Sequence, residues 1–180
     1  DGFKKSLLQS IKKVEAALGT TFGSINNPLL FSVRSGARQS MPGMMETVLN
    51  VGLTSSTLEG LIHQTKDEQF AYDSYRRLIM MYSDVVIEKA NNLNSGIREH
   101  LDSLLMSTKK DNNIVHDSEM PVLLLKELCQ KFQAEIKKKL NQNFPNDPYE
   151  QLWSTIKAVF ISWNGFRAKE YRKIENIPNN

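Results

Sequence analysis

The chain has 180 residues, of which 40% are hydrophobic and 24% charged, and its formal net charge at neutral pH is +3. This composition is typical of a globular protein with one domain or two small lobes, and the small charge excludes a strong general attraction to nucleic acid or membranes. No apolar run approaches the roughly 20 residues that span a bilayer, and the single cysteine, Cys129, fits the reducing environment of the cytoplasm.

The first third of the chain is expected to hold a helix, a strand and a polar loop. Residues 3–18 carry apolar side chains at three- and four-residue steps and end at Gly19, a pattern that predicts an amphipathic helix. The apolar run at 29–34 predicts a strand that delivers Arg34 into a loop rich in glycine, serine and proline. After this loop, residues 45–51 are expected to form a short helix.

The middle of the chain has helical apolar spacing from residue 54 to about residue 140, which predicts a small bundle of four short helices. Ser55 or Ser56 is expected to cap the first helix, with a capping box from Ser56 to Glu59. Asp67 is expected to start the longest apolar stripe, and Ser118 to cap the last helix of the group.

The last part of the chain starts with a segment rich in proline and asparagine at 141–148, which is the best candidate for a linker. Apolar residues then share one helical face over 152–163, and residues 167–177 are expected to continue as a second helix. Together with the strand at 29–34, these elements predict a mainly α-helical chain with a small β element, in the α+β class.

The loop that follows Arg34 carries the residue types that bind phosphate. Arg34 and Arg38 supply planar guanidinium groups that make bidentate contacts to phosphate oxygens, and the hydroxyl of Ser40 adds a donor. Gly36 and Gly43 let backbone N–H groups approach an anion closely. The loop lacks the Gly-Lys-Ser/Thr ending of a Walker A loop. By composition alone, a basic surface turn remains the alternative interpretation.

Two strings in this loop and several segments downstream form one collinear set. The loop strings are Ser32-Val-Arg-Ser-Gly-Ala-Arg and Ser40-Met-Pro-Gly-Met-Met. The downstream segments are Phe70-Ala-Tyr-Asp-Ser-Tyr-Arg-Arg, Met81-Tyr-Ser-Asp-Val-Val, Asp147-Pro148, Gln151-Leu-Trp, Ile156-Lys-Ala-Val-Phe, Ser162-Trp-Asn, Arg167-Ala and Tyr171-Arg. This set resembles the ATP-grasp domain of the pyruvate, phosphate dikinases, and the resemblance runs from about Pro28 to the last residues.

The resemblance implies a division of the chain into three parts. Residues 1–53 would be part of an ATP-grasp lobe with its phosphate-binding loop, residues 54–143 a helical insertion, and residues 144–180 helices that return to the lobe. It also implies that Arg34 is catalytic, because a fixed planar cation holds the charge that develops on a moving phosphoryl group. The contacts to ATP would come from Arg34, Gly36, Arg38, Ser40, Gly43 and Thr47.

The resemblance further implies a phosphotransferase with paired acceptors that interconverts ATP, phosphate and pyruvate with AMP, pyrophosphate and phosphoenolpyruvate. The reaction would pass through a phosphohistidine on a separate domain of a homodimeric enzyme, with Mg²⁺ accompanying ATP. The family's N-terminal lysine and its later acidic metal-binding residues fall outside this chain, so the isolated fragment is expected to be inactive and to bind ATP weakly. A phosphoenolpyruvate synthase, which uses water instead of phosphate, and a non-catalytic helical interaction module are the alternatives.

The histidines are expected to be ordinary residues. His63, His100 and His116 fall in the helical part, and none lies in a motif that resembles the family's phosphohistidine. No two of them have the i, i+4 spacing of a helical metal site. Within the resemblance, Glu46 replaces the more usual aspartate and Gly165 the more usual proline.

Overall fold

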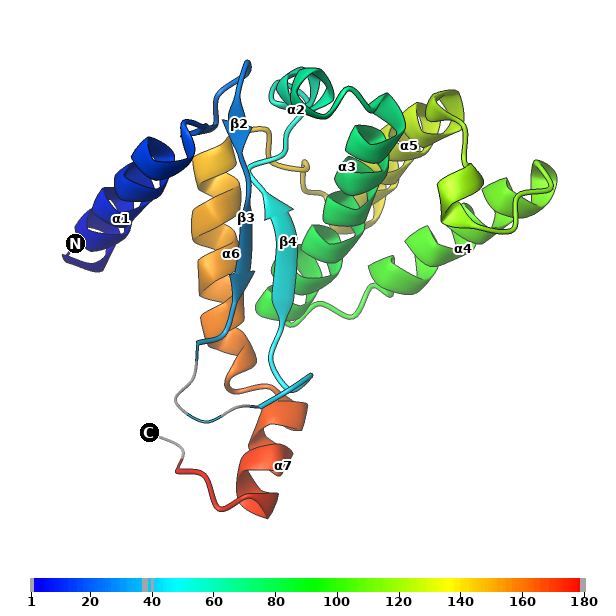
Figure 1. The fold of residues 1–180 in the computed structure, drawn as a ribbon. Helices are drawn as coiled ribbons and strands as arrows, with labels where there is room; N and C mark the ends of the chain where they lie inside the picture. The colour runs from blue at the N-terminus through cyan, green and yellow to red at the C-terminus, as the bar shows by residue number, and fades with distance from the viewer. Residues whose placement is uncertain (1, 37–38, 40, 179–180) are drawn as a thin grey trace.

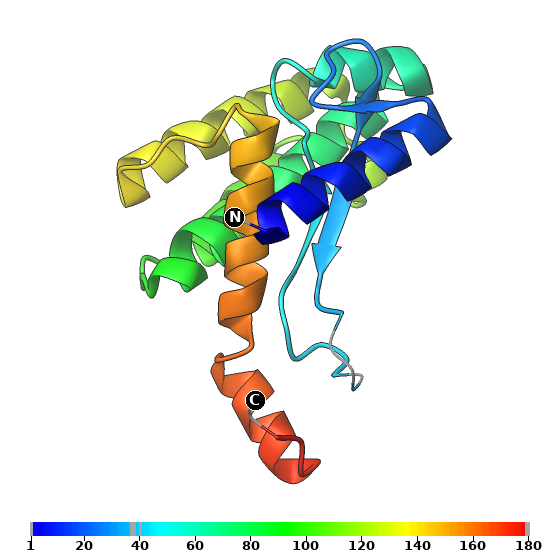
Figure 2. The same ribbon diagram turned by 90° about the vertical axis from the view of Figure 1, so that its left-hand side faces the viewer.

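The computed structural model describes residues 2–36, 39 and 41–178, which form a mainly helical molecule with two small sheets (Figures 1 and 2). This confirms the predicted mainly α chain with a small β element. In chain order the elements are α1 (Gly2–Leu18), β1 (Thr21–Phe22), β2 (Pro28–Leu29), β3 (Phe31–Arg34), β4 (Thr47–Val51), α2 (Leu58–Thr65), α3 (Glu68–Tyr82), the π-helix η1 (Ser83–Glu88), the 3-10 helix η2 (Lys89–Asn91), α4 (Ile97–Asp111), the 3-10 helix η3 (Asp117–Glu119), α5 (Val122–Leu140), α6 (Pro148–Ser162) and α7 (Phe166–Ile174). Within the described ranges, no helix has both the length and the apolar character needed to cross a membrane.

The β3–β4 hairpin is the element that carries the predicted phosphate loop. The two strands are antiparallel, with Val33 opposite Val48 and Arg34 opposite Thr47. Val48 is fully buried, and both strands contact α6, which lies behind them in Figure 1. Successive side chains of a strand point to opposite faces. The hairpin therefore packs one face on the helices and leaves the other open, where Ser32, Arg34, Thr47 and Leu49 are exposed.

The helix predicted for residues 45–51 is wrong, because residues 47–51 form β4. The segment is too short for its apolar spacing to separate a helix from a strand. Pairing with β3 decides the outcome, since each strand satisfies the backbone donors and acceptors of the other. The strand predicted for 29–34 is present but interrupted at Leu30, so that β2 pairs with β1 and β3 pairs with β4.

The predicted helix starts are partly correct. Asp67 caps α3, and its carboxylate accepts a hydrogen bond of 2.8 Å from the backbone N–H of Phe70. The capping box predicted from Ser56 is wrong, because α2 begins one residue later, after Thr57. The cap predicted at Ser118 is also wrong, because this residue lies within η3 and α5 begins beyond it.

The segment predicted as a linker has no helix or strand over residues 141–147, but it is not loosely attached. Phe144 is buried, and the centroid of its ring lies 6.0 Å from the ring centroid of Tyr75 and 5.4 Å from that of Tyr82. This anchor holds the start of α6 against α3, because both tyrosines belong to that helix. The division of the chain into residues 1–53, 54–143 and 144–180 stays a prediction.

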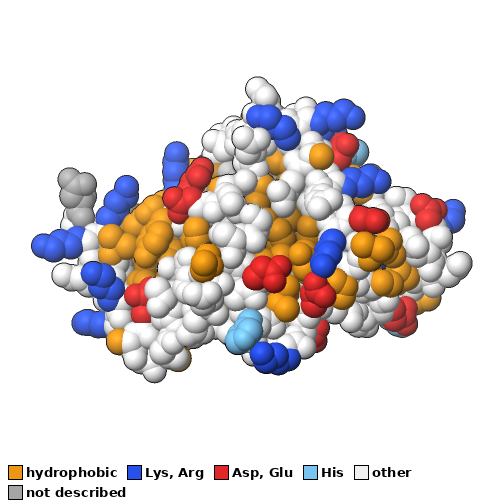
Figure 3. All heavy atoms as spheres, turned by 90° about the horizontal axis from the view of Figure 1, so that it is seen from above, with side chains coloured by type: hydrophobic (Ala, Val, Ile, Leu, Met, Phe, Trp, Pro, Cys, Tyr) orange, Lys and Arg blue, Asp and Glu red, His pale blue; other side chains and the backbone are white. Residues whose placement is uncertain are grey.

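The predicted N-terminal helix is confirmed as α1, although most of its apolar stripe is not buried. Ile11 is its only buried residue, whereas Phe3 is 57% and Leu18 is 62% exposed. Hydrophobic side chains accordingly reach the surface near α1 at the left-hand end of Figure 3. The helix contacts α6 near its own start, where the rings of Phe3 and Phe160 are 6.2 Å apart.

A buried arginine joins α3 to the turn that precedes α5. The side chain of Arg76 is 3% exposed, and its Nη2 lies 3.0 Å from Asp117 Oδ2 and 2.5 Å from Asp73 Oδ1. Asp117 also accepts a bond of 2.7 Å from Lys109 Nζ. The hydrogen bond from Lys109, together with the charge of Arg76, lowers the pKa of Asp117 below its usual value.

We expect Asp117→Asn to lower the free energy of unfolding by roughly 1 kcal/mol at pH 7. Folding lowers the pKa of Asp117, so the contribution of this carboxylate is fully present above its unfolded pKa of about 3.9 and is lost as the pH falls through the folded value. Urea unfolding of the two proteins at several pH values should show the difference shrinking in acid. A difference that does not change between pH 7 and strong acid would contradict this assignment.

Candidate phosphate-binding site

Two of the predicted site residues meet on the open face of the β3–β4 hairpin. Arg34 and Thr47 are directly opposite each other in the antiparallel register, and both are exposed. Paired residues of neighbouring strands project from the same face of a sheet. The guanidinium of Arg34 forms no hydrogen bond and no salt bridge within the described part of the chain, so its charge is available to an anion.

The loop between the strands shows one position where glycine is required. Gly43 has φ of +72°, in a turn closed by a 3.2 Å hydrogen bond from Met44 N–H to the carbonyl of Met41. Gly36 does not have a positive φ, and a Cβ atom at either glycine would meet nothing within 4 Å. The predicted phosphate contacts of Arg38 and Ser40 lie outside the described residues.

The end of the loop is held by Glu46, a residue to which the sequence assigned no role. Its Oε1 accepts hydrogen bonds from Lys89 Nζ at 3.2 Å and Arg167 Nη2 at 2.8 Å. Its backbone N–H donates to Ser162 Oγ at 3.2 Å. These partners lie 43, 121 and 116 residues further along the chain, and no local periodicity could have revealed them.

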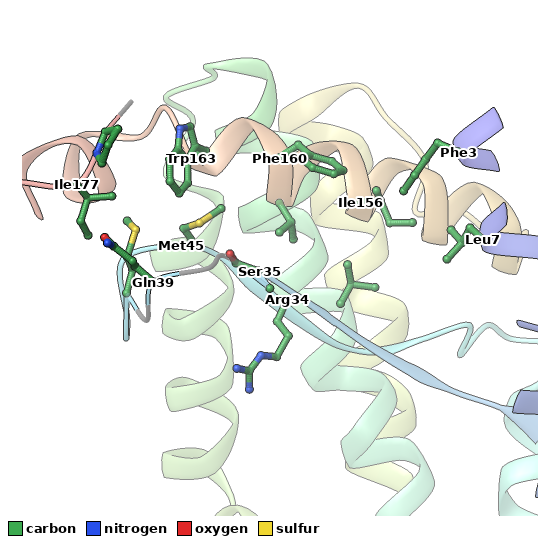
Figure 4. A pocket seen from close by; sticks show the side chains of 15 residues that line it. Phe3, Leu7, Arg34, Ser35, Gln39, Met45, Ile156, Phe160, Trp163 and Ile177 are labelled. Carbon is green, nitrogen blue, oxygen red and sulfur yellow. The ribbon is translucent and has the colours of Figure 1, made fainter. Parts of the chain in front are cut away.

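An apolar cleft of about 920 Å³ lies between the loop, α1 and α6. Arg34 borders it, but Figure 4 shows that the guanidinium points away from Phe160 and Ile156. Successive side chains of a strand point to opposite faces, so Val33 faces the cleft and Arg34 faces away from it. The apolar lining consists of Phe3, Leu7, Val33, Met41, Met45, Ile156, Val159, Phe160, Trp163, Ile177 and Pro178.

Trp163 lines one end of this cleft, and its indole ring is held in place by Arg172. The guanidinium of Arg172 stacks over the ring of Trp163 at 4.1 Å, and its Nη1 donates to the carbonyl of Trp163 at 2.6 Å. A cation over an aromatic face is attracted by the ring, which fixes the indole in place. The cleft therefore suits an apolar or aromatic group, whereas the open hairpin face beside it suits an anion.

The residues near Arg34 do not fit a magnesium ion. Magnesium binds through oxygen ligands such as free carboxylates, and Glu46 already bonds with two cations. Over the described residues, no group of three or more histidine, cysteine, aspartate or glutamate side chains could hold a metal. His100 Nε2 lies 2.7 Å from Glu135 Oε2, while His63 and His116 are exposed.

Known proteins are similar in amino-acid sequence to this chain over nearly its whole length. Residues 1–180 match the family described as pyruvate phosphate dikinase, AMP/ATP-binding domain, and the chain belongs to this family. Among individual relatives, it is 43% identical over 173 residues to the pyruvate, phosphate dikinase of Clostridium symbiosum. It is 40% identical over 179 residues to the enzyme of the same name from Rhizobium meliloti.

These alignments cover 96% and 99% of this chain but only 19% of each relative. A third similar protein, the pyruvate, phosphate dikinase of Entamoeba histolytica, is 40% identical over 96% of the chain and is also covered over 19% of its length. The chain thus spans about one fifth of the length of the relatives it matches.

Proposed function

We propose that this chain is part of the ATP-binding domain of a pyruvate, phosphate dikinase and that Arg34 contacts the triphosphate of ATP. The observation that carries the proposal is the exposed Arg34 guanidinium, which no described side chain neutralises, on the open face of the hairpin beside Thr47. A planar cation at the end of a strand can stabilise the negative charge that develops as a phosphoryl group is transferred.

The rest of the predicted set would supply further contacts to phosphate. The hydroxyl of Thr47 and the backbone N–H groups at Gly36 and Gly43 are further donors to phosphate oxygens, and Arg38 and Ser40 complete the proposed set. We propose that this hairpin belongs to an ATP-grasp lobe and that the helices at residues 54–143 are an insertion in that lobe. Magnesium would reach the site with ATP, and its protein ligands would lie outside this chain.

The whole enzyme would convert ATP, phosphate and pyruvate into AMP, pyrophosphate and phosphoenolpyruvate. A histidine on another domain of the same polypeptide would carry the phosphoryl group, and the full-length enzyme would be a homodimer. The support is the family match and the name shared by the similar proteins.

Activity of the full-length polypeptide that carries this chain tests the proposal. Purified enzyme should form phosphoenolpyruvate and pyrophosphate from ATP and pyruvate only when phosphate is present. Turnover that ignores phosphate would identify a phosphoenolpyruvate synthase instead. Absence of any ATP consumption would identify a helical interaction module, the non-enzyme alternative.

The isolated chain of 180 residues should bind Mg-ATP with a dissociation constant no tighter than about 1 mM, equivalent to roughly −4 kcal/mol, and should show no turnover. The reason is that one open hairpin face supplies only part of a site that must surround the nucleotide. Calorimetric titration of the isolated chain measures this directly. A micromolar dissociation constant that weakens in Arg34→Ala would show that the fragment holds a nearly complete site.

A further inference from the structure

Glu46 joins the phosphate loop to three separate parts of the helical structure. Its carboxylate, whose side chain is 19% exposed, bonds with Lys89 at the start of η2 and with Arg167 in the first turn of α7. Its backbone N–H bonds with Ser162, the last residue of α6. The next residue along the chain, Thr47, begins β4 and pairs with Arg34.

The π-helix η1 explains how Lys89 reaches this position. Lys89 N–H donates to the carbonyl of Asp84, five residues earlier, and Lys89 Nζ lies 2.9 Å from Asp84 Oδ2. Residues five apart on an α-helix are separated by roughly 140° and do not face each other. The wider π-helical turn stacks them, so Asp84 orients the ammonium group toward Glu46.

The four charges alternate in sign from Asp84 through Lys89 and Glu46 to Arg167. Burial acts to lower the pKa of Lys89, but the hydrogen bond to Asp84 and the charge of Glu46 outweigh it and raise this pKa above its usual value. Lys89 therefore stays charged at neutral pH, and the row of ion pairs persists.

We infer that Glu46 is a positioning residue that keeps the phosphate loop ready for ATP, an inference that rests on the function proposed for Arg34. From Met41 onward the described loop has one backbone turn before β4 begins, so the polar contacts of Glu46, together with the side chains of Met41 and Met45 in the cleft, hold its end against the helices. When the contacts of Glu46 are broken, the end of the loop can move. The hydrophobic core keeps its packing, because Glu46 is not part of it.

The expected consequence is weaker use of ATP with little change in overall stability. The cationic partners of Glu46 are exposed, Lys89 at 48% and Arg167 at 57%, and ion pairs with exposed cations contribute little to global unfolding because solvent screens them. Ligand affinity, in contrast, falls in proportion to the fraction of protein in the competent conformation. We therefore expect Glu46→Gln in the full-length enzyme to raise the KM for ATP by roughly tenfold while kcat stays within about twofold.

Glu46→Asp should restore part of the affinity, because it keeps the charge and shortens the reach by one methylene. Arg167→Gln should raise the KM for ATP, and the double variant Glu46→Gln with Arg167→Gln should add little to Glu46→Gln. Arg98→Gln is the matched control for Arg167→Gln, since it removes another exposed arginine, which pairs with Asp102 at 2.8 Å on α4. It should change neither the KM for ATP nor the thermal midpoint.

Two readouts decide the inference. Hydrogen exchange of the amides at 44–47 should be faster in Glu46→Gln than in wild type, and the KM for pyruvate should not change. A KM for ATP within twofold of wild type, unchanged exchange, or an equal rise in both KM values overturns the positioning role alone. If the wild-type enzyme itself does not turn over ATP, the function proposed for the chain is wrong. This result differs from the outcomes above, in which wild type is active and only the positioning role of Glu46 fails.

Discussion

Replacing Arg34 by alanine is expected to lower ATP-dependent histidine phosphorylation in the full-length enzyme by at least roughly 10²- to 10³-fold. The guanidinium is proposed to hold the charge of the phosphoryl group in the transition state, and a methyl group cannot replace it. The fold should not change, because Arg34 is exposed and its side chain forms no hydrogen bond or salt bridge with a described residue. The free energy of unfolding should stay within about 0.5 kcal/mol of wild type.

Rapid-quench measurement of phosphoenzyme formation, with thermal unfolding of the same samples, tests this prediction. Arg34→Lys should recover only part of the rate, because an ammonium group keeps the charge but lacks the planar, bidentate fork. Arg98→Ala removes an exposed arginine of α4 and should leave the rate unchanged. Labelling at the wild-type rate in Arg34→Ala would exclude this residue from the mechanism.

Replacing Glu88 by alanine is expected to lower the free energy of unfolding by roughly 3 kcal/mol, the largest effect on stability that we predict. Glu88 is buried at 6% exposure at the end of η1. Its Oε1 accepts from the backbone N–H groups of Ser95 and Gly96 at 2.5 and 2.8 Å, and its Oε2 from Ile97 at 3.2 Å. These groups lie at the N-terminus of α4, where alanine would leave one buried and two half-buried donors without this acceptor.

For a domain of this size, the expected loss corresponds to a fall in Tm of about 6–12 °C. Glu88→Gln should show an intermediate loss, since it keeps one acceptor oxygen but removes the charge. Glu127→Ala, on the exposed face of α5, is the matched control and should stay within about 0.5 kcal/mol of wild type. Equal stability of Glu88→Ala and Glu127→Ala would contradict the role assigned to Glu88.

The long helices could be predicted because their apolar spacing repeats over several turns. The stripe after Asp67 and the stripe that ends at Leu140 correspond to α3 and α5, which pack against each other. Short segments gave no such signal. The pattern of residues 45–51 predicts a helix, but residues 47–51 form β4, because pairing with β3 outweighs local preference.

The capping prediction is correct for Asp67 and wrong for Ser56. Asp67 bonds within its own helix. Ser56 does not cap α2, because the neighbouring Thr57 turns its hydroxyl to the carbonyl of Gly52, at 2.9 Å, and the helix begins after it. The start of this short helix thus depends on a contact with a residue that precedes it in the chain.

One segment of the family resemblance has a structural explanation away from the predicted site. Gln151 is fully buried, and its Oε1 accepts from Gly52 N–H at 3.0 Å. Its Nε2 donates to the carbonyls of Leu53 and Pro145, both at 3.0 Å. A buried amide with all three partners holds the end of β4, the segment before α6 and α6 itself together.

The sequence by itself determined the residue types of the phosphate loop, the positions of the long helices and the resemblance to the dikinases, because each is written in local spacing and composition. Only the tertiary structure decided that Arg34 and Thr47 share the open face of a hairpin and that Glu46 is held by Lys89 and Arg167. The physical reason is that these contacts join residues that are not neighbours in the chain. The pairing of Arg34 with Thr47 forms only when β3 and β4 come together, and the ion pairs of Glu46 form only when η2 and α7 pack beside the loop.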